Sequence, residues 1–515
     1  MLSVTSTWAI YIIYMGALII FGVFVWWRDR HKSTTHFYTA GNSIHWFVLC
    51  MTYIAALMST WVFFSGPGGY YRGGFGYYMS ELSYMPLFPV LTYFVMNKVW
   101  LINTRRGYAT PADIYADRFK SPVLRLILAL VFFAVSMPYA AAIYVACGQA
   151  ANVASGGLIS NTSVIIFVGI TALLFVPFGG VKSVAWAATV QGWIFMIALW
   201  TIGISAFVVG FDGSFGDAVA SVWTNSNNWF SYPGPASWAP YSARLGYPLA
   251  CAIGWTIMLP DVFIRAGYFG KDLAAQRQLM RFQPALQLIV WTGCMVIGFV
   301  AIALVPGLSG ADTELVIPYL ITEIISPEMM GFAIILMSLF VWGVLAKGLS
   351  AATSHLLVAG SIISEDILAK LLKLKVSKNT HMVIARLAVA ALGIAAMVLA
   401  INPPDLIWTL IMFAIALVMP IFPVLVATLY WRRATAPGAI WASIIGVIGV
   451  IVTYKMGYGD AWYGLFGMIA AAVVLVVVSL LTKPMDKAVL DEFYGQLEAA
   501  EDEYYEQEAA RGAAK

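Results

Sequence analysis

The chain has 515 residues, of which 61% are hydrophobic and only 10% are charged, and its formal net charge is +4. This composition excludes an ordinary soluble protein and is typical of a protein that crosses a membrane many times. The charged residues form no basic surface interleaved with aromatics, so nucleic-acid binding is excluded as well. The four cysteines each lie in an apolar run and make no metal-ligand spacing, so we expect neither a metal site nor a cofactor.

Apolar runs of about 20 residues, the length at which a helix crosses a ~30 Å hydrocarbon layer, recur along the whole chain. They predict transmembrane helices rather than the strands of a barrel. The first run is followed by "WWRDRHK", a stop-transfer pattern, so we expect it to remain as a helix. We predict thirteen spans, at residues 7–28, 45–66, 76–101, 123–150, 162–179, 183–211, 246–266, 284–306, 330–364, 382–401, 406–430, 437–455 and 462–482.

Lysine and arginine are distributed as the short cytoplasmic loops of a membrane protein require. If the N-terminus lies outside, 25 of the 29 basic residues fall in inner loops or in the C-terminal tail, Arg265 among them. Lys347 is the one basic residue predicted inside a span. We therefore expect a protein embedded in the lipid bilayer of the cell (inner) membrane, with its N-terminus outside and its C-terminus in the cytoplasm.

Helix breakers are placed unevenly along the spans. They are Gly66–Gly69 after the second span, Pro138 in the fourth, Pro260 in the seventh and Pro403–Pro404 before the eleventh. Broken helices are tolerated in a membrane only where they are buried in protein or line a wet cavity, so they indicate a substrate path. The second and seventh spans are five apart, which is the spacing that two inverted five-helix repeats give.

Five stretches of the chain carry a resemblance to a known family. They are "FSGPGGYYRGG" (64–74), "RRGYATPADIYADRF" (105–119), "FGGVKSVAWAATVQG" (178–192), "GWTIMLPDVFIRAG" (254–267) and "LSAATSHLLVAGSIISEDIL" (349–368). In this order and spacing the stretches resemble the sodium:solute symporter family, which includes transporters of proline, pantothenate, sialic acid and sugars.

This resemblance implies an all-α membrane protein of the LeuT type, with a 5+5 inverted repeat and alternating access around a site near the bilayer midplane. It also implies one extra helix before the core and two after it. The expected parts are 1–44, an extra helix and loop; 45–211, the first repeat; 246–430, the second repeat; 431–483, two C-terminal helices; and 484–515, an acidic cytoplasmic tail.

In the family, a sodium ion lies where the broken second span meets the ninth, bound by backbone carbonyls of the former and hydroxyls of the latter. The carbonyl donors correspond to Ala55 and Met58, but an acidic residue common at the next turn is replaced by Leu57. Where two adjacent hydroxyl residues are usual, this chain has Ser350 followed by Ala351. The resemblance thus predicts a coupling-ion site that has lost oxygen ligands.

Two further departures from the family pattern concern charge. An aspartate in the family's W-x-D-T-V-Q pattern is replaced here by Ala188, and Lys347 stands one helical turn before Ser350, where a small residue is usual. A lysine at a helix centre costs ~2.5–3.5 kcal/mol on insertion scales, so it must face the interior or water. Lys347, Ser350 and Ser354 share one helix face, which we expect to turn inward.

We hypothesise that the Lys347 ammonium replaces the sodium ion. Its three donors would then bind the carbonyls of Ala55 and Met58 and the hydroxyl of Ser350. Because burial favours the neutral amine, a buried lysine can exchange its proton near physiological pH, and Lys347 would then carry a coupling proton. The alternative is a permanently charged strut in an uncoupled facilitator or a substrate-driven carrier.

Few other ionisable groups lie within the predicted spans. Asp261 and Glu81 are the candidate proton partners of the lysine, with Asp261 slightly favoured, although either can be a satisfied residue near a helix end. His355, two turns from Lys347, is placed to relay protons, and the alternative is a simple hydrogen-bonded histidine. The Glu365–Asp366 pair matches a family motif and is expected to cap the inner gate.

Aromatic residues of the broken helices and the fourth span are the candidates for substrate binding. Trp255 is the strongest, because it matches a family position that lies over the substrate as an inner gate. Half-helix ends and a nearby lysine favour an anion, so we expect a small monocarboxylate such as lactate, pyruvate, acetate or propionate. The other candidates are Trp61, Tyr53, Phe63, Tyr139, Tyr144 and, at the edge of the site, Gln191.

Two alternative functions remain open at this level. The first is a conventional sodium-coupled symporter for an amino acid or carboxylate, and the second is a transporter-like membrane sensor. An enzyme is not expected, because "GGYYRGGFG" is interpreted as a loop between spans rather than a nucleotide-binding motif. The tail from Asp486 is predicted to be a solvated helix, with a small accessory subunit or a cytoplasmic partner as the alternative role.

Overall fold

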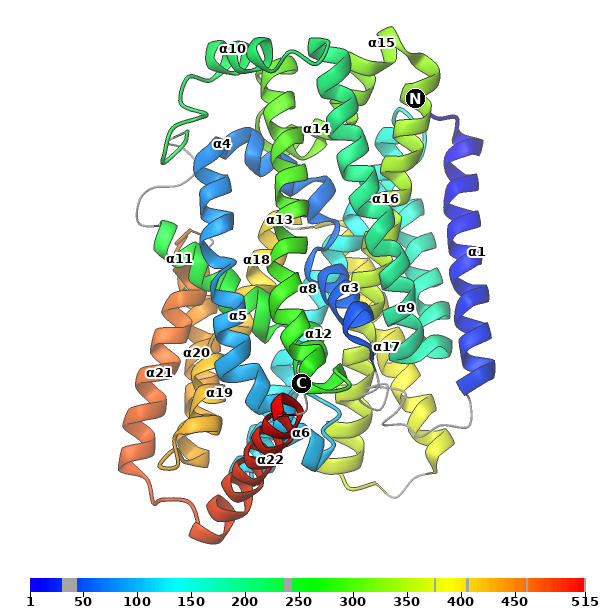
Figure 1. Cartoon of the computed structure of the whole chain (residues 1–515). Helices are drawn as coiled ribbons and strands as arrows, with labels where there is room; N and C mark the ends of the chain where they lie inside the picture. The colour runs from blue at the N-terminus through cyan, green and yellow to red at the C-terminus, as the bar shows by residue number, and fades with distance from the viewer. Residues whose placement is uncertain (30–43, 236–242, 375–376, 404–406, 460–461, 514–515) are drawn as a thin grey trace.

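The structure of the chain is a computed structural model and describes residues 1–29, 44–235, 243–374, 377–403, 407–459 and 462–513. These residues form a bundle of helices, with α10 and α22 at its opposite ends and α1 at its periphery (Figure 1). The described residues contain no strand, and Ile44 and Gly270 form an isolated bridge. Nine described helices are long and apolar enough to span a membrane, and one bent pair and three shorter apolar helices complete the thirteen predicted segments. The chain is therefore a multi-pass membrane protein.

The first half of the described chain is helical almost throughout. Its helices are α1 (Val4–Asp29), α3 (Trp46–Leu57), η1 (Thr60–Phe63), α4 (Ser65–Tyr84), α5 (Leu87–Leu91), η2 (Thr92–Met96), α6 (Asn97–Arg106), α7 (Asp113–Phe119), α8 (Pro122–Ala154), α9 (Asn161–Phe211) and α10 (Phe215–Asn225). The predicted spans 162–179 and 183–211 both lie in α9, as the apolar segments Asn161–Leu174 and Val184–Phe211.

The second half begins with a bent pair. Its helices are α11 (Ala243–Ala250), η3 (Cys251–Met258), α12 (Pro260–Ile264), η4 (Arg265–Phe269), α13 (Leu273–Leu304), η5 (Gly310–Leu315), α14 (Val316–Tyr319), η6 (Leu320–Ile325), α15 (Ser326–Glu328), α16 (Met330–Ser361), η7 (Ile362–Leu371), α17 (Lys378–Ile401), α18 (Ile407–Val418), α19 (Ile421–Tyr430), α20 (Ala436–Lys455), α21 (Trp462–Leu481) and α22 (Lys487–Ala513).

Local sequence explains where several helices begin. The Ser121 hydroxyl accepts a hydrogen bond from the Leu124 N–H at 3.2 Å, and Pro122 occupies the first turn of α8, where its missing N–H costs nothing. Pro260 begins α12 in the same way after the break at Leu259. Segments Gly246–Met258 and Pro260–Phe269 meet at 57°, which confirms the predicted break in the seventh span. Pro138, in contrast, lies within a continuous α8.

The break in the second span differs from the prediction. Helix α3 ends at Leu57, and the chain leaves helical geometry at Met58 and Ser59, before the glycine-rich stretch. Gly66–Gly69 and the predicted loop "GGYYRGGFG" lie inside α4, with a kink at Gly74, where φ is +58°. The reason is close packing: a Cβ atom on Gly68 would overlap the Thr313 carbonyl and one on Gly76 the Pro233 carbonyl, so these glycines allow a close backbone contact rather than end the helix.

The C-terminal tail is helical, as predicted, but it is not solvated on all sides. Helix α22 lies across α6 at one end of the bundle (Figure 1). Phe493, Tyr494 and Leu497 are buried, and the Tyr494 ring packs against the guanidinium groups of Arg118 and Arg432. The tail therefore uses its aromatic face to bind its own chain.

A charged cluster ties α7, α8 and η7 together near the same end of the bundle. Asp113 accepts hydrogen bonds from Lys370 at 2.6 Å and from Arg125, and Arg125 also donates to Asp366 at 2.7 Å. Burial alone disfavours the charged carboxylate, but Lys370 and Arg125 outweigh it and lower the pKa of Asp113 to about 2. Asp366, one of the two acidic residues expected to cap the inner gate, is thus held by a neighbouring helix.

Candidate functional site

Three tryptophans meet where the two broken spans face each other. The ring centroids of Trp61 and Trp255 are 5.8 Å apart, and Trp291 lies 4.8 Å from Trp61 and 6.0 Å from Trp255. At the break after α3, the Leu57 carbonyl accepts hydrogen bonds from the Ser59 N–H at 3.2 Å and from the Trp255 Nε1–H at 2.8 Å. Trp255 thus joins the two breaks, while its role over the substrate stays a prediction, and Trp291 is not among the residues predicted from the sequence.

Lys347 is fully buried in the middle of α16, and Ser350 and Ser354 are buried on the same helix. Among the described residues the Lys347 ammonium has no hydrogen-bond acceptor, and its Nζ lies 5.3 Å from the centroid of the Phe195 ring of α9. The Ser350 Oγ likewise has no hydrogen-bond partner within the described chain. Lys347 and Ser350 are therefore buried polar groups without a hydrogen bond.

The predicted hydrogen bonds from Lys347 to the carbonyls of Ala55 and Met58 and to Ser350 are not made in this structure. The side chain leaves α16 toward Phe195 on α9, so the ammonium contacts the face of an aromatic ring instead. Ala55 and Met58 are both buried at the end of α3, and their role in a coupling-ion site stays a prediction.

Arg265 is the residue that the sequence analysis misplaced. It was counted in an inner loop, but it is 3% exposed and lies just after the short helix α12. Its guanidinium donates to the Ser354 Oγ at 2.6 Å, to the Thr52 Oγ1 at 3.2 Å and to the Asp261 carbonyl at 2.7 Å. The four-residue spacing of Asp261 and Arg265 beside Pro260 was the signal that could have indicated a buried pair.

Asp261 lies between two cationic or titratable partners. One carboxylate oxygen is 3.6 Å from Arg265 Nη1 and the other is 3.6 Å from His355 Nε2. Neither oxygen accepts a hydrogen bond from the described residues, and the same holds for both ring nitrogens of His355. The His355 ring packs on Tyr139 with centroids 4.3 Å apart. Asp261 and His355 are thus neighbours, as a proton relay requires.

Glu81, the second candidate proton partner, lies in a different environment. Its carboxylate accepts hydrogen bonds from the hydroxyl groups of Tyr84, at 2.9 Å, and Tyr247. Tyr84 in turn accepts from Gln287 at 2.9 Å. The Glu81 carboxylate thus has hydrogen-bond partners in the described chain, whereas the Asp261 carboxylate has none.

The remaining substrate candidates lie in three different places: at the broken helices, between η1 and α16, and within α8. The Tyr53 hydroxyl donates to the Thr256 carbonyl in the bent span, and Tyr139 contacts His355, so both lie at the broken helices. Phe63 packs on Phe340 with centroids 5.9 Å apart and is a packing residue of η1 and α16, while Tyr144 is buried within α8.

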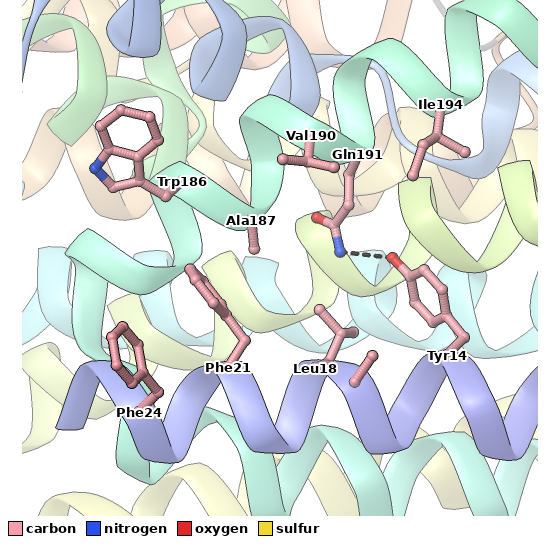
Figure 2. Close-up of a pocket in the computed structure, with 10 residues that line it drawn as sticks. Tyr14, Leu18, Phe21, Phe24, Trp186, Ala187, Val190, Gln191 and Ile194 are labelled. Atoms are coloured by element: carbon pink, nitrogen blue, oxygen red, sulfur yellow. Dashed lines mark hydrogen bonds between the residues drawn. The ribbon is translucent and has the colours of Figure 1, made fainter. Parts of the chain in front are cut away.

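The sequence predicts Gln191 at the edge of the substrate site, but the structure places its side chain elsewhere. It faces the peripheral helix α1, where its Nε2 donates to the Tyr14 hydroxyl at 2.7 Å (Figure 2).

The site as a whole is a buried arrangement of unequal charge. Arg265 and the titratable His355 each lie 3.6 Å from the Asp261 carboxylate. Lys347, a second buried basic side chain, lies against the Phe195 ring of α9. Burying a charge is costly unless it is paired and hydrogen-bonded, so the excess positive charge favours an anion at this place.

Comparisons with known proteins agree with this architecture. The chain is 27% identical over 512 residues to the sodium/proline symporter of Escherichia coli, covering 93% of this chain and 94% of that protein. It is 24% identical over 437 residues to the sodium/pantothenate symporter of Haemophilus influenzae, covering 84% and 86% of the two chains. The solved structure of a Na⁺-coupled sialic acid symporter in a substrate-bound outward-open state superposes with a TM-score of 0.78 at 18% identity, covering 93% of this chain and 99% of that one.

The predicted all-α membrane fold of the LeuT type is confirmed by this structural similarity. The family relatives are transporters rather than enzymes, as expected. The model of the sodium:solute symporter family matches residues 37–446, and the chain belongs to this family.

Proposed function

We propose that this secondary transporter imports a small monocarboxylate by alternating access, with a proton carried by Lys347 as the coupling ion. The observation that carries the proposal is the buried Lys347 ammonium, which has no hydrogen-bond acceptor among the described residues and lies near Ser350, whose hydroxyl is also unpaired. An unpaired buried charge costs several kcal/mol (~3–5) when no partner replaces the missing one. A substrate carboxylate supplies that partner.

The charge balance of the site supports an anionic substrate. Arg265 already has three protein hydrogen-bond acceptors, whereas Lys347 has none within the described chain, so the lysine is the cation that is available to a ligand. Proline, pantothenate and sialic acid, the substrates named for the relatives, all carry a carboxylate. A monocarboxylate needs few further hydrogen bonds, and the aromatic pair Trp61 and Trp255 offers an apolar wall for its short chain.

Proton coupling is supported by what replaces the sodium ligands. The family pattern has oxygen-bearing side chains at the positions that are Leu57, Ala188 and Ala351 in this chain. It has a small residue where this chain has the basic residue Lys347. Because a lysine changes its charge when it exchanges a proton, substrate and proton binding are linked at Lys347. The pair Asp261 and His355 then forms the route by which the proton leaves, in a protein oriented with its N-terminus outside.

The test is radiolabelled uptake of lactate, pyruvate, acetate and propionate into proteoliposomes, under an inward proton gradient or an inward sodium gradient. We expect uptake that is driven by protons, is indifferent to sodium, is lost in Lys347→Met and is retained in Lys455→Met, a matched change at an exposed lysine. Sodium-driven uptake that survives Lys347→Met contradicts the proposal and indicates a conventional symporter. Uptake that neither gradient drives, but that Lys347→Met abolishes, makes the lysine a strut and refutes coupling.

A further inference from the structure

A groove between the peripheral helix α1 and helix α9 opens away from the broken helices. Its volume is about 620 Å³, which lies within the ~300–1,000 Å³ typical of ligand sites. Figure 2 shows ten lining residues, and all except Tyr14 and Gln191 have hydrocarbon or indole side chains. Phe24, Trp186 and Val190 are half exposed or more, so the groove opens toward the surface that the lipid covers.

One polar pair lies inside this apolar groove. The Gln191 Nε2 donates to the Tyr14 hydroxyl at 2.7 Å, while the Gln191 Oε1 has no hydrogen-bond partner among the described residues (Figure 2). Gln191 lines the cavity and is only 5% exposed, so its side-chain carbonyl oxygen is a buried acceptor without a partner on a residue of the cavity wall. The Tyr14 oxygen accepts from Gln191, which leaves the hydroxyl hydrogen of Tyr14 for another partner. The pair thus offers one acceptor and one donor.

The depth of this pair excludes the usual partners. Tyr14 lies near the middle of the apolar segment Val4–Phe24, about 15 Å from either end at ~1.5 Å per residue, and so near the centre of a ~30 Å hydrocarbon layer. Bulk water and phospholipid headgroups do not reach this depth, and a plain acyl chain has no hydrogen-bonding group there. The partner must therefore be a membrane-soluble molecule that brings its own polar atom.

We infer that the α1–α9 groove is a binding site for a membrane-soluble amphiphile with a hydroxyl group, such as a prenyl or sterol-like alcohol. The hydroxyl donates to Gln191 and accepts from Tyr14, while the hydrocarbon body packs on Leu18, Phe21 and Trp186. A hydroxyl both donates and accepts, so it satisfies the pair with the Gln191 amide in either orientation, whereas an ether or ketone satisfies only one. The ligand lies one helical turn from Phe195, the ring that Lys347 faces.

The test uses a diazirine-labelled C15 prenyl alcohol as the probe and the same chain ending in a methyl group as its control. Both are photo-crosslinked to the full-length protein in lipid vesicles, and the labelled peptides are mapped. We expect the alcohol to label residues 14–24 and 186–194. We expect Gln191→Leu to lower this labelling about fivefold, the size of one net hydrogen bond.

The variants Tyr14→Phe and Gln149→Leu complete the experiment. Tyr14→Phe is expected to lower labelling by the alcohol by a similar factor, and Gln149→Leu, a matched change on α8 outside the groove, is expected to leave it unchanged. The methyl-ended chain should label the groove weakly and equally in all variants. Equal labelling by both probes, or alcohol labelling that survives Gln191→Leu in a protein with unchanged melting, overturns the proposal, as does the absence of labelling in the groove.

Discussion

Replacing Asp261 by asparagine tests whether the buried charge cluster stabilises the protein. Unit charges 3.6 Å apart, the distance from the Asp261 carboxylate to Arg265 Nη1, attract by about 4.6 kcal/mol at an effective dielectric constant of ~20. Asp261→Asn leaves the Arg265 guanidinium buried without a counter-charge, which typically costs ~3–5 kcal/mol. With an unfolding entropy of ~2.1 cal/mol/K per residue over 515 residues, the apparent melting temperature should fall by about 3–5 °C.

The four cysteines of the chain make this shift measurable. All four are buried and free, so a thiol-reactive fluorescent dye reports unfolding in detergent without added labels. Asp312→Asn, at an exposed position, is the matched control and should change the melting temperature by less than about 1 °C. The double variant Asp261→Asn/Arg265→Met removes both charges and should recover part of the loss. If Asp261→Asn melts with the wild type, or if the double variant loses the sum of both single changes, the reasoning is refuted.

Three further predictions concern other parts of the fold. Asp113→Asn should lower the melting temperature at pH 7, because Lys370 and Arg125, which hold the pKa of Asp113 at about 2, lose their carboxylate partner. That pKa lies below the unfolded value of ~3.9, so the wild-type advantage should vanish as the pH falls from about 4 to 2. Tyr494→Ala should release α22 to limited proteolysis, since truncating a buried aromatic costs ~3–5 kcal/mol, whereas Glu503→Ala, at a largely exposed ion pair worth ~0–1 kcal/mol, should not. Gly74→Ala should lower the melting temperature, because φ is +58° and its Cβ would overlap the Trp229 carbonyl, while Gly16→Ala, with open space around it, should not.

Much of the fold could be predicted from the sequence because the membrane constrains it strongly. A span needs about 20 apolar residues whatever its neighbours, so each of the thirteen predicted segments overlaps a helix of the described chain. Nine of the described helices, or ten if the bent pair counts as one span, are long and apolar enough to cross a membrane. The break at Pro260 was predictable because proline lacks an N–H and begins a helix more easily than it continues one. The burial of Lys347 followed from its distance to either surface.

Other features depend on tertiary packing and could not be predicted locally. The glycines at 66–69 looked like a helix end, but they lie within α4 because neighbouring backbones approach them closely. Arg265 is the next-to-last residue of the predicted span 246–266, so its charge favoured the adjoining inner loop, whereas its three acceptors hold it inside the bundle. Gln191 follows the family pattern in sequence, yet its contact is set by α1, a helix outside the repeats.

The two buried carboxylates illustrate how a structural acid differs from one available for proton exchange. Glu81 accepts hydrogen bonds from two tyrosine hydroxyls. In a glutamine at this position, the amide oxygen can accept from one hydroxyl and the amide nitrogen can donate to the other, because a hydroxyl oxygen also accepts. Asp261 accepts no hydrogen bond within the described chain, so its negative charge, rather than its shape, balances the neighbouring cations. Glu81→Gln should therefore retain proton-driven monocarboxylate uptake in proteoliposomes, and Asp261→Asn should lose it even when assayed well below its melting temperature. Loss of proton coupling in Glu81→Gln with retention in Asp261→Asn would reverse the assignment and place the proton route along α4 instead of the bent span.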